Sequence, residues 1–129
     1  MPVRRVALGP ATYLPSEGFV VVPIVPPHRL PDTTVARSAL VGYVDGVPKA
    51  YANLCRHLAI ALDYGDGDVS DEGDHEFVRC RRHGAVFAAR DGMCVAGPCL
   101  GLALWPLTIE IGPFGEAALV LGDEPSEPR

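Results

Sequence analysis

The apolar positions of this chain fall into short segments separated by glycine, proline and acidic residues. In the first half these segments predict three strands, at residues 19–25, 39–44 and 47–54. Pro23 places the first of them at the edge of a sheet, because proline cannot donate to a strand ladder. Asp45-Gly46 is typical of a two-residue type I′ hairpin turn between the other two. Residues 1–18 have no clear period, so no element is predicted there.

The second half continues the same pattern. It predicts five further strands, at residues 77–79, 85–90, 93–96, 102–111 and 117–121. Asp91-Gly92 is a second hairpin signal, and Leu107, Ile109 and Ile111 alternate toward the interior of their strand. Short strands joined by many turns predict an all-β fold.

Length and composition agree with one β-rich domain. The 129 residues include 14 glycines and 13 prolines, which favour turns over long helices. We expect a single domain over residues 1–122 and a disordered polar tail over residues 123–129. The net charge of −5 argues against nucleic acid as a partner, because nucleic acid requires a basic surface. No apolar run has the length of a membrane span and no export signal is recognisable, so we expect no membrane partner and a cytoplasmic location.

Two short pieces carry the residues with the clearest chemistry. Cys55 and His57 lie two positions apart, Cys80 and His83 lie three apart, and 22 residues separate the pieces. Positions i and i+2 point to the same side of a strand or tight loop but not of a helix, so Cys55 and His57 indicate a loop. A short helical turn after His57 stays open, because the apolar residues there have helical spacing. Together the pieces offer two thiolates and two imidazoles, a set of four metal ligands.

Two kinds of metal fit this set. Zinc accepts two Cys and two His, but it usually takes like ligands in pairs. In a [2Fe–2S] cluster that binds Cys on one iron and His on the other, each piece gives one ligand to each iron, which explains the mixed order. On the residues alone, a structural zinc module stays an alternative.

The two pieces resemble the pattern of the Rieske family, which is C-x-H, a spacer, and then C-x-x-H-G. Here the pattern stands as Cys55-Arg56-His57 and Cys80-Arg81-Arg82-His83-Gly84. The similarity continues over residues 85–112, with a strand, an Asp-Gly turn, a Gly-Pro loop at Gly97-Pro98 and a further strand. It implies a Rieske-type antiparallel β-sandwich or barrel with a cluster-binding subdomain of two loops, at about residues 51–99. It also implies a [2Fe–2S] cluster held by Cys55, His57, Cys80 and His83.

The resemblance implies a soluble one-electron carrier that passes electrons from a reductase to an oxygenase or related enzyme. We expect no catalytic residue and no small-molecule substrate, because only His28 and His75 remain for an oxygenase iron site beyond the four ligands. An alternative is a non-catalytic accessory subunit of a larger reductase, of the nitrite reductase small-subunit type. The partners in either case are redox proteins.

Several residues outside the ligand set have simpler interpretations. Cys94 and Cys99 are expected to be small buried residues, neither ligands nor a required disulfide. His28 is predicted to be a surface residue, and His75 to point into water. The spacer over residues 63–76 holds seven acids and three glycines, which favours a solvated loop. A calcium loop of the EF-hand type is rejected, because its order of ligands is absent.

The residues around the ligands also lead to expectations about partner docking and the reduction potential. Arg56, Arg81 and Arg82 flank the ligands and predict a positive rim for partner docking, with transfer rates that fall with salt. High-potential Rieske proteins link their cluster loops by a disulfide, at positions held here by Ile60 and Arg82. The same proteins donate hydroxyl hydrogen bonds to cluster sulfurs from positions that match Ala85 and Phe87. Because no donor stands at either position, a low reduction potential is predicted.

Overall fold

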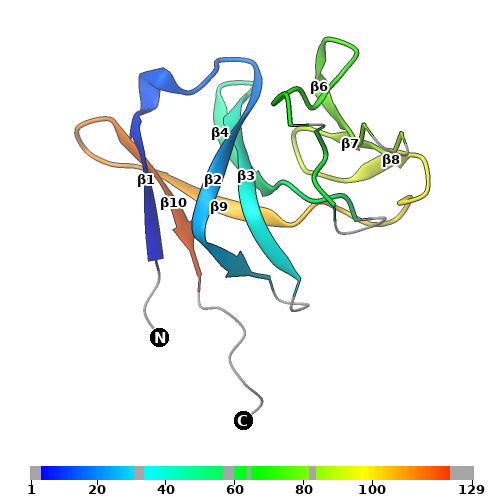
Figure 1. The fold of residues 1–129 in the computed structure, drawn as a ribbon. Helices are drawn as coiled ribbons and strands as arrows, with labels where there is room; N and C mark the ends of the chain where they lie inside the picture. The colour runs from blue at the N-terminus through cyan, green and yellow to red at the C-terminus, as the bar shows by residue number, and fades with distance from the viewer. Residues whose placement is uncertain (1–3, 31–33, 57–59, 64, 82–83, 123–129) are drawn as a thin grey trace.

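A computed structural model describes residues 4–30, 34–56, 60–63, 65–81 and 84–122, which form two antiparallel sheets (Figure 1). The six-stranded sheet has the order β1 (Arg4–Pro10), β10 (Glu116–Leu121), β9 (Pro106–Ile111), β4 (Val47–Ala52), β3 (Val35–Val44) and β2 (Gly18–Arg29). The four-stranded sheet has the order β5 (Ser70–Asp71), β6 (Asp74–Arg79), β7 (Val86–Ala88) and β8 (Cys94–Ala96). The predicted all-β class is confirmed.

The six-stranded sheet curls until its two edge strands approach each other. A 3₁₀ turn at Ala11–Tyr13 leads from β1 toward β2. Across the gap between these strands, the Arg4 guanidinium on β1 donates a 2.8 Å hydrogen bond to the Pro26 carbonyl on β2. The sheet is therefore an almost closed antiparallel barrel, as the Rieske resemblance implied.

The β3–β4 hairpin delivers the first ligand piece. Asp45 and Gly46 have φ angles of 52° and 77°, the left-handed pair that a type I′ turn requires, so the predicted turn is confirmed. Strand β4 then pairs with both β3 and β9 and ends three residues before Cys55. The first ligand loop therefore follows directly after a strand in the middle of the large sheet.

Two cores stabilise the two parts of the fold. The barrel core contains Ile24, Leu30, Ala39, Val41, Leu119 and Leu121 among its buried residues. The second core joins Leu40 and Tyr51 of the large sheet to Val78, Phe87 and all four cysteines. Tyr51 ties the two sheets together, because its buried hydroxyl donates a 2.7 Å hydrogen bond to the Ala89 carbonyl. Burial, with a smaller contribution from the charge of Asp91, raises the pKa of Tyr51 to about 12, so this donor keeps its proton.

Several strand predictions are confirmed. The edge position of β2, the hairpin strands β3 and β4, the strands β6, β7 and β8, and the closing strand β10 all lie where the pattern placed them. Strand β9 is shorter than predicted and begins at Pro106, with residues 102–105 contributing only a bridge between Met93 and Ala103. Leu107 and Ile109 are half-buried on the core side, but Ile111 is exposed where β9 runs into the turn before β10.

Two predictions in the first part of the chain are wrong. The absence of an element over residues 1–18 is contradicted by β1, which exists because it pairs along β10 and packs Val6 and Leu8 on the barrel core. His28 was predicted on the surface, but it is buried because β2 continues past its prolines and pairs His28 with Ala36 of β3. The predicted tail lies outside the described residues, and so do residues 57–59 of the alternative helical turn after His57, while residues 60–63 are not helical. In the described part, no helix is long and apolar enough to cross a membrane.

Candidate metal centre

The first ligand loop is closed by a backbone hydrogen bond. Cys55 is fully buried just after β4, and its amide donates to the Ile60 carbonyl at 2.8 Å. This bond joins Cys55 to Ile60, on the far side of residues 57–59 in the sequence. His57 falls inside the loop but outside the described residues, so its role stays a prediction.

Two backbone hydrogen bonds close the second ligand loop. Cys80 follows β6 directly and is fully buried, and its amide donates to the Ala85 carbonyl at 2.8 Å. The Gly84 amide donates back to the Cys80 carbonyl at 2.9 Å. Gly84 has a φ of 75°, which favours glycine, and a Cβ built there meets no atom within 4 Å. The described atoms therefore leave space open at the Cβ position of Gly84. His83 lies outside the described residues.

The two loops are joined to each other. The Arg81 amide, next to Cys80, donates a 2.9 Å hydrogen bond to the Leu62 carbonyl at the end of the first loop. Cys55 and Cys80 belong to the same buried core cluster. The structure thus brings together the two predicted cysteine ligands, which lie on loops separated by 22 residues between His57 and Cys80.

A third segment, which contains the Gly97-Pro98 motif, packs against the second ligand loop. A Cβ on Gly97 would lie 2.8 Å from the Cα of Ala85 and 3.3 Å from the Gly84 carbonyl oxygen, so only glycine fits this approach to the second loop. The Leu102 amide donates to the Cys99 carbonyl at 2.9 Å and closes a turn after Pro98. The segment thus lies against the second ligand loop.

All four cysteines are described, buried and outside any disulfide. The Cys94 thiol donates to the Ala96 carbonyl at 3.2 Å. Burial raises the pKa of the Cys99 thiol above its usual range, and a smaller effect of a side-chain hydrogen bond with Cys55 opposes this rise. The sequence predicted the burial of both residues but not the contact between Cys99 and a ligand cysteine.

The start of the acidic spacer is a structural anchor of the first loop. Asp63 was predicted to be solvated with the other acids, but it is only 8% exposed. Its carboxylate accepts hydrogen bonds from the Asn53 amide and from the Gly65 and Gly67 backbone, at 2.9–3.0 Å. Burial opposes ionisation, but these hydrogen bonds prevail and hold the pKa of Asp63 below its usual value. The Asx-type spacing of Asp63 to Gly65 was the available sequence signal.

The two described arginines of the predicted positive rim make contacts within the chain. The Arg56 guanidinium lies 4.3 Å from the ring centroid of Trp105 and donates to the Ala103 carbonyl at 2.8 Å. Arg81 pairs with Asp66 at 3.2 Å and with Asp68 at 4.0 Å. Its charge is therefore largely balanced by the spacer. Arg82 lies outside the described residues.

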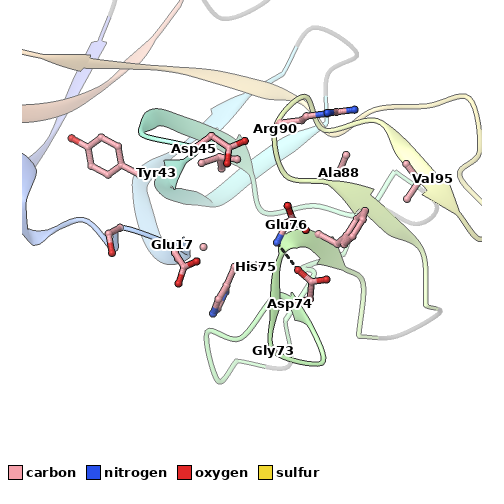
Figure 2. A pocket seen from close by; sticks show the side chains of 14 residues that line it. Glu17, Tyr43, Asp45, Gly73, Asp74, His75, Glu76, Ala88, Arg90 and Val95 are labelled. Carbon is pink, nitrogen blue, oxygen red and sulfur yellow. Dashed lines mark hydrogen bonds between the residues drawn. The ribbon is translucent and has the colours of Figure 1, made fainter.

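One cavity in the described part of the chain is separate from this site. It has a volume of about 590 Å³ and lies between the end of β3 and the β6–β8 strands, as Figure 2 shows. Four acids, Glu17, Asp45, Asp74 and Glu76, contribute to its lining, together with the basic side chains of Arg90 and His75. His75 is exposed, as predicted. None of the four cysteines lines the cavity, so it is not the metal site.

The residues that are described fit a [2Fe–2S] cluster. The thiols of Cys55 and Cys80 come from two closed loops and lie in the same buried core, and no described atom lies within 4 Å of a Cβ built on Gly84. The Gly97 segment packs against the second of these loops, at Ala85. The fold and site define a β-barrel protein with a two-loop iron–sulfur centre.

Comparison by family agrees with this class. The family model of the Rieske [2Fe-2S] domain matches residues 21–106, about two-thirds of the chain. The chain therefore belongs to the Rieske [2Fe–2S] domain family, and its cofactor is a [2Fe–2S] cluster. No curated protein sequence matches it.

Solved structures show the same fold at low sequence identity. The ferredoxin of carbazole 1,9a-dioxygenase from Nocardioides aromaticivorans IC177 is 19% identical, with a TM-score of 0.61 and coverage of 89% of this chain and 95% of that one. A putative NADH-dependent nitrite reductase small subunit from Mycobacterium tuberculosis is 18% identical, with a TM-score of 0.61 and coverage of 95% and 99%. The terminal oxygenase of carbazole 1,9a-dioxygenase from Novosphingobium sp. KA1 is 20% identical, with a TM-score of 0.67. This chain is covered to 98% but spans only 31% of that oxygenase chain.

Proposed function

We propose that this protein is a soluble, cytoplasmic one-electron carrier that passes electrons from a reductase to an oxygenase or a related enzyme. The observation that carries the proposal is the joining of two ligand loops around Cys55 and Cys80 in one buried core. Residues 1–122 act as a single domain in this proposal, with residues 51–99 as its cluster-binding part. Its structural similarity to a dioxygenase ferredoxin over nearly the whole of both chains supports a carrier.

We assign the four ligands by their chemistry. Cys55 and Cys80, as thiolates, hold the inner iron, and His57 and His83 hold the outer iron through neutral nitrogens. The cluster supplies reversible uptake of one electron. The chain's own task is to keep the two thiolates buried and to leave the histidine edge near the surface, where a partner can approach. No residue is assigned a catalytic role, so the protein is proposed not to be an enzyme by itself.

Partner docking is proposed on an apolar surface rather than a positive rim. Four apolar side chains of the segment that covers the site are exposed: Met93 (42%), Val95 (48%), Leu100 (66%) and Leu102 (42%). This tip surface adjoins both cysteine loops, through Gly97 against Ala85 and through Cys99 against Cys55. Because electron transfer slows steeply with distance, the acceptor enzyme must dock beside the cluster. We propose that it covers this tip surface with an apolar face of its own.

The similarity to a nitrite reductase small subunit favours one alternative, an accessory subunit that stays bound to a large reductase. The two functions predict different assembly states of the protein in extracts of its native cells. A carrier migrates mainly as a free 13.7 kDa chain and cross-links briefly to its partners, whereas an accessory subunit elutes in a stable large complex.

The experiment that tests the proposal begins with the purified protein. Analysis should give two irons and two acid-labile sulfides per chain, and a titration with dithionite should require one electron. Size-exclusion of a native extract, followed by the absorbance of the cluster, then separates carrier from subunit. Stoichiometric zinc in place of iron would overturn the proposal.

A further inference from the structure

We propose that Arg56 is held as a fixed positive charge beside the first ligand loop and raises the reduction potential of the cluster, an inference that rests on the proposed ligand role of Cys55. Arg56 directly follows Cys55 in the sequence, and its side chain is half-buried. The guanidinium lies 4.3 Å from the ring centroid of Trp105 and donates a 2.8 Å hydrogen bond to the Ala103 carbonyl. Two contacts within the chain therefore fix the position of this charge.

The segment that receives the guanidinium is itself bonded to both sheets. The Trp105 carbonyl accepts a 2.9 Å hydrogen bond from the amide of Ala52, the last residue of β4 in the large sheet. Ala103 forms a bridge with Met93, the residue directly before β8 in the small sheet. Residues 103–105 are thus fixed on both sides, and Arg56 contacts a well-anchored part of the fold.

The charge of Arg56 is not balanced by an acid. Within the described part of the chain, no carboxylate forms an ion pair with Arg56. Arg81 differs, because this residue after the other ligand cysteine pairs with Asp66 and Asp68. A half-buried cation over an aromatic ring keeps its charge but loses part of its water. Its field on neighbouring groups is therefore stronger than the field of a fully solvated arginine.

The effect on the potential has a definite sign. Reduction adds negative charge to the cluster, so a fixed positive charge nearby stabilises the reduced state more than the oxidised state. Removing the charge should therefore lower the potential. We expect the ratio of oxidised to reduced protein at a fixed solution potential to rise roughly threefold, which corresponds to about 28 mV at 59 mV per tenfold change for one electron. Trp105 is a positioning residue, because it acts on the potential only through Arg56.

Voltammetry of the purified holoprotein tests this, after iron and sulfide analysis of each variant. Arg56→Met keeps a long side chain over the ring but removes the charge, so it should lower the potential, whereas Arg56→Lys keeps the charge and should stay near the wild-type value. Trp105→Leu changes no charge but releases the guanidinium into water, so it should also lower the potential, and Trp105→Phe, which keeps an aromatic face, should not. Arg5→Met is the matched control. It removes the same charge from β1, on the far side of Figure 1 from β7 and β8, and should leave the potential unchanged.

The outcomes separate this inference from the function on which it rests. A wild-type protein without an iron–sulfur cluster would overturn both together. A cluster-bearing Arg56→Met variant with the wild-type potential would overturn the tuning role alone. So would an Arg56→Lys variant shifted as far down as Arg56→Met, because the effect would then come from lost contacts rather than lost charge.

The double variant Arg56→Met, Trp105→Leu tests the positioning role of Trp105. Because Trp105 acts through Arg56, the double variant should have the same potential as Arg56→Met alone. Two shifts that add in the double variant would show that Trp105 acts independently of the arginine. A Trp105→Leu variant with the wild-type potential would likewise overturn its positioning role.

Discussion

The side-chain amide of Asn53 donates a 3.0 Å hydrogen bond to the carboxylate of Asp63, and both groups are buried. The Asn53 side chain also accepts from the Leu62 amide at 3.0 Å and donates to the Ser38 hydroxyl at 3.1 Å. Asn53 lies two residues before Cys55, and Asp63 begins the acidic spacer. This pair therefore fixes both ends of the first ligand loop to each other and to β3.

Replacing Asp63 by Asn should destabilise the fold. The new amide keeps the shape but loses an acceptor, which leaves a buried donor of Asn53, Gly65 or Gly67 unsatisfied. Such a loss costs about 1–3 kcal/mol. Denaturant unfolding of the holoprotein measures it, with Glu72→Gln as the control. Glu72 also carries a spacer charge, but its side chain is 83% exposed and 3.8 Å from Arg79, so its loss should stay within about 0.5 kcal/mol. Equal stability of the two variants would contradict the anchor role.

Acid should remove the same stabilisation. The folded-state pKa of Asp63 is lowered, so its contribution is fully present above the unfolded pKa of about 3.9 and is lost as the pH falls through the lowered folded value. The pKa of Asp68 is lowered too, mainly by hydrogen bonds from Ser70. The unfolding free energy of the wild type should therefore fall below about pH 4, and more steeply than that of Asp63→Asn. Parallel pH curves for the two proteins would show that Asp63 does not titrate with folding.

Features specified by neighbouring residues could be predicted from the sequence. Asp45-Gly46 requires left-handed φ angles that few residues adopt, and it formed the expected turn. The spacing of Cys55 and His57 excluded a helix, and Cys55 does lie in a closed loop after a strand. The Gly97-Pro98 loop was recognised only through the Rieske resemblance, and the structure adds that Gly97 lies against Ala85 of the second loop.

Features that depend on distant partners could not be predicted. β1 lacks a strong pattern of its own, and its strand is specified by β10 at the other end of the chain. His28 follows two prolines, yet it is buried because β3 supplies its strand partner. Asp63 looked like any acid of the spacer until Asn53 was brought beside it. The contact of Cys99 with Cys55 likewise arises only when two loops meet.

The assigned ligands make a direct prediction. Cys55→Ser and Cys80→Ser should each lose the cluster and destabilise the fold, because metal binding and folding are coupled in such sites. His57 and His83 replaced by Ala should also lose it. The double variant Cys94→Ala, Cys99→Ala should keep two irons and two sulfides per chain. Loss of the cluster from that double variant in an otherwise folded protein would mean that the ligands are misassigned.

If the acceptor enzyme docks on the apolar tip surface, a polar substitution in that surface should slow electron transfer. Leu100→Gln should lower the rate to the acceptor enzyme identified by native purification roughly tenfold, equivalent to about 1.4 kcal/mol of lost docking energy. Phe114→Gln is the matched control, because Phe114 is 93% exposed at the β9–β10 turn, which lies on the opposite side of Figure 1 from β6–β8. Stopped-flow mixing measures both rates.

The same experiment separates the two docking hypotheses by salt. Raising the ionic strength from about 0.1 M to 1 M shortens the screening length from about 10 Å to 3 Å. An apolar contact should keep its rate across this range, because Arg56 and Arg81 are already engaged within the chain. A steep fall of the rate with salt, together with a normal rate for Leu100→Gln, would restore the positive rim.

The last prediction concerns the reduction potential itself. Ala85 and Phe87 are fully buried beside the ligand loops and offer no hydroxyl to cluster sulfurs, and Ile60 cannot form the disulfide of high-potential relatives. We therefore expect a potential toward the low end of the Rieske range, around −150 mV and nearly independent of pH near neutrality.

Adding a donor should move this value upward. Ala85→Ser places a hydroxyl at the position where high-potential relatives carry one. A single neutral hydrogen bond contributes about 0.5–1.5 kcal/mol, which for one electron is roughly 20–60 mV. The Gly97 backbone lies close to Ala85, so the iron content of the variant is measured before its voltammetry. A wild-type potential above roughly +150 mV would contradict the argument from missing donors, and an unshifted Ala85→Ser variant with a full cluster would show that this position does not reach a sulfur.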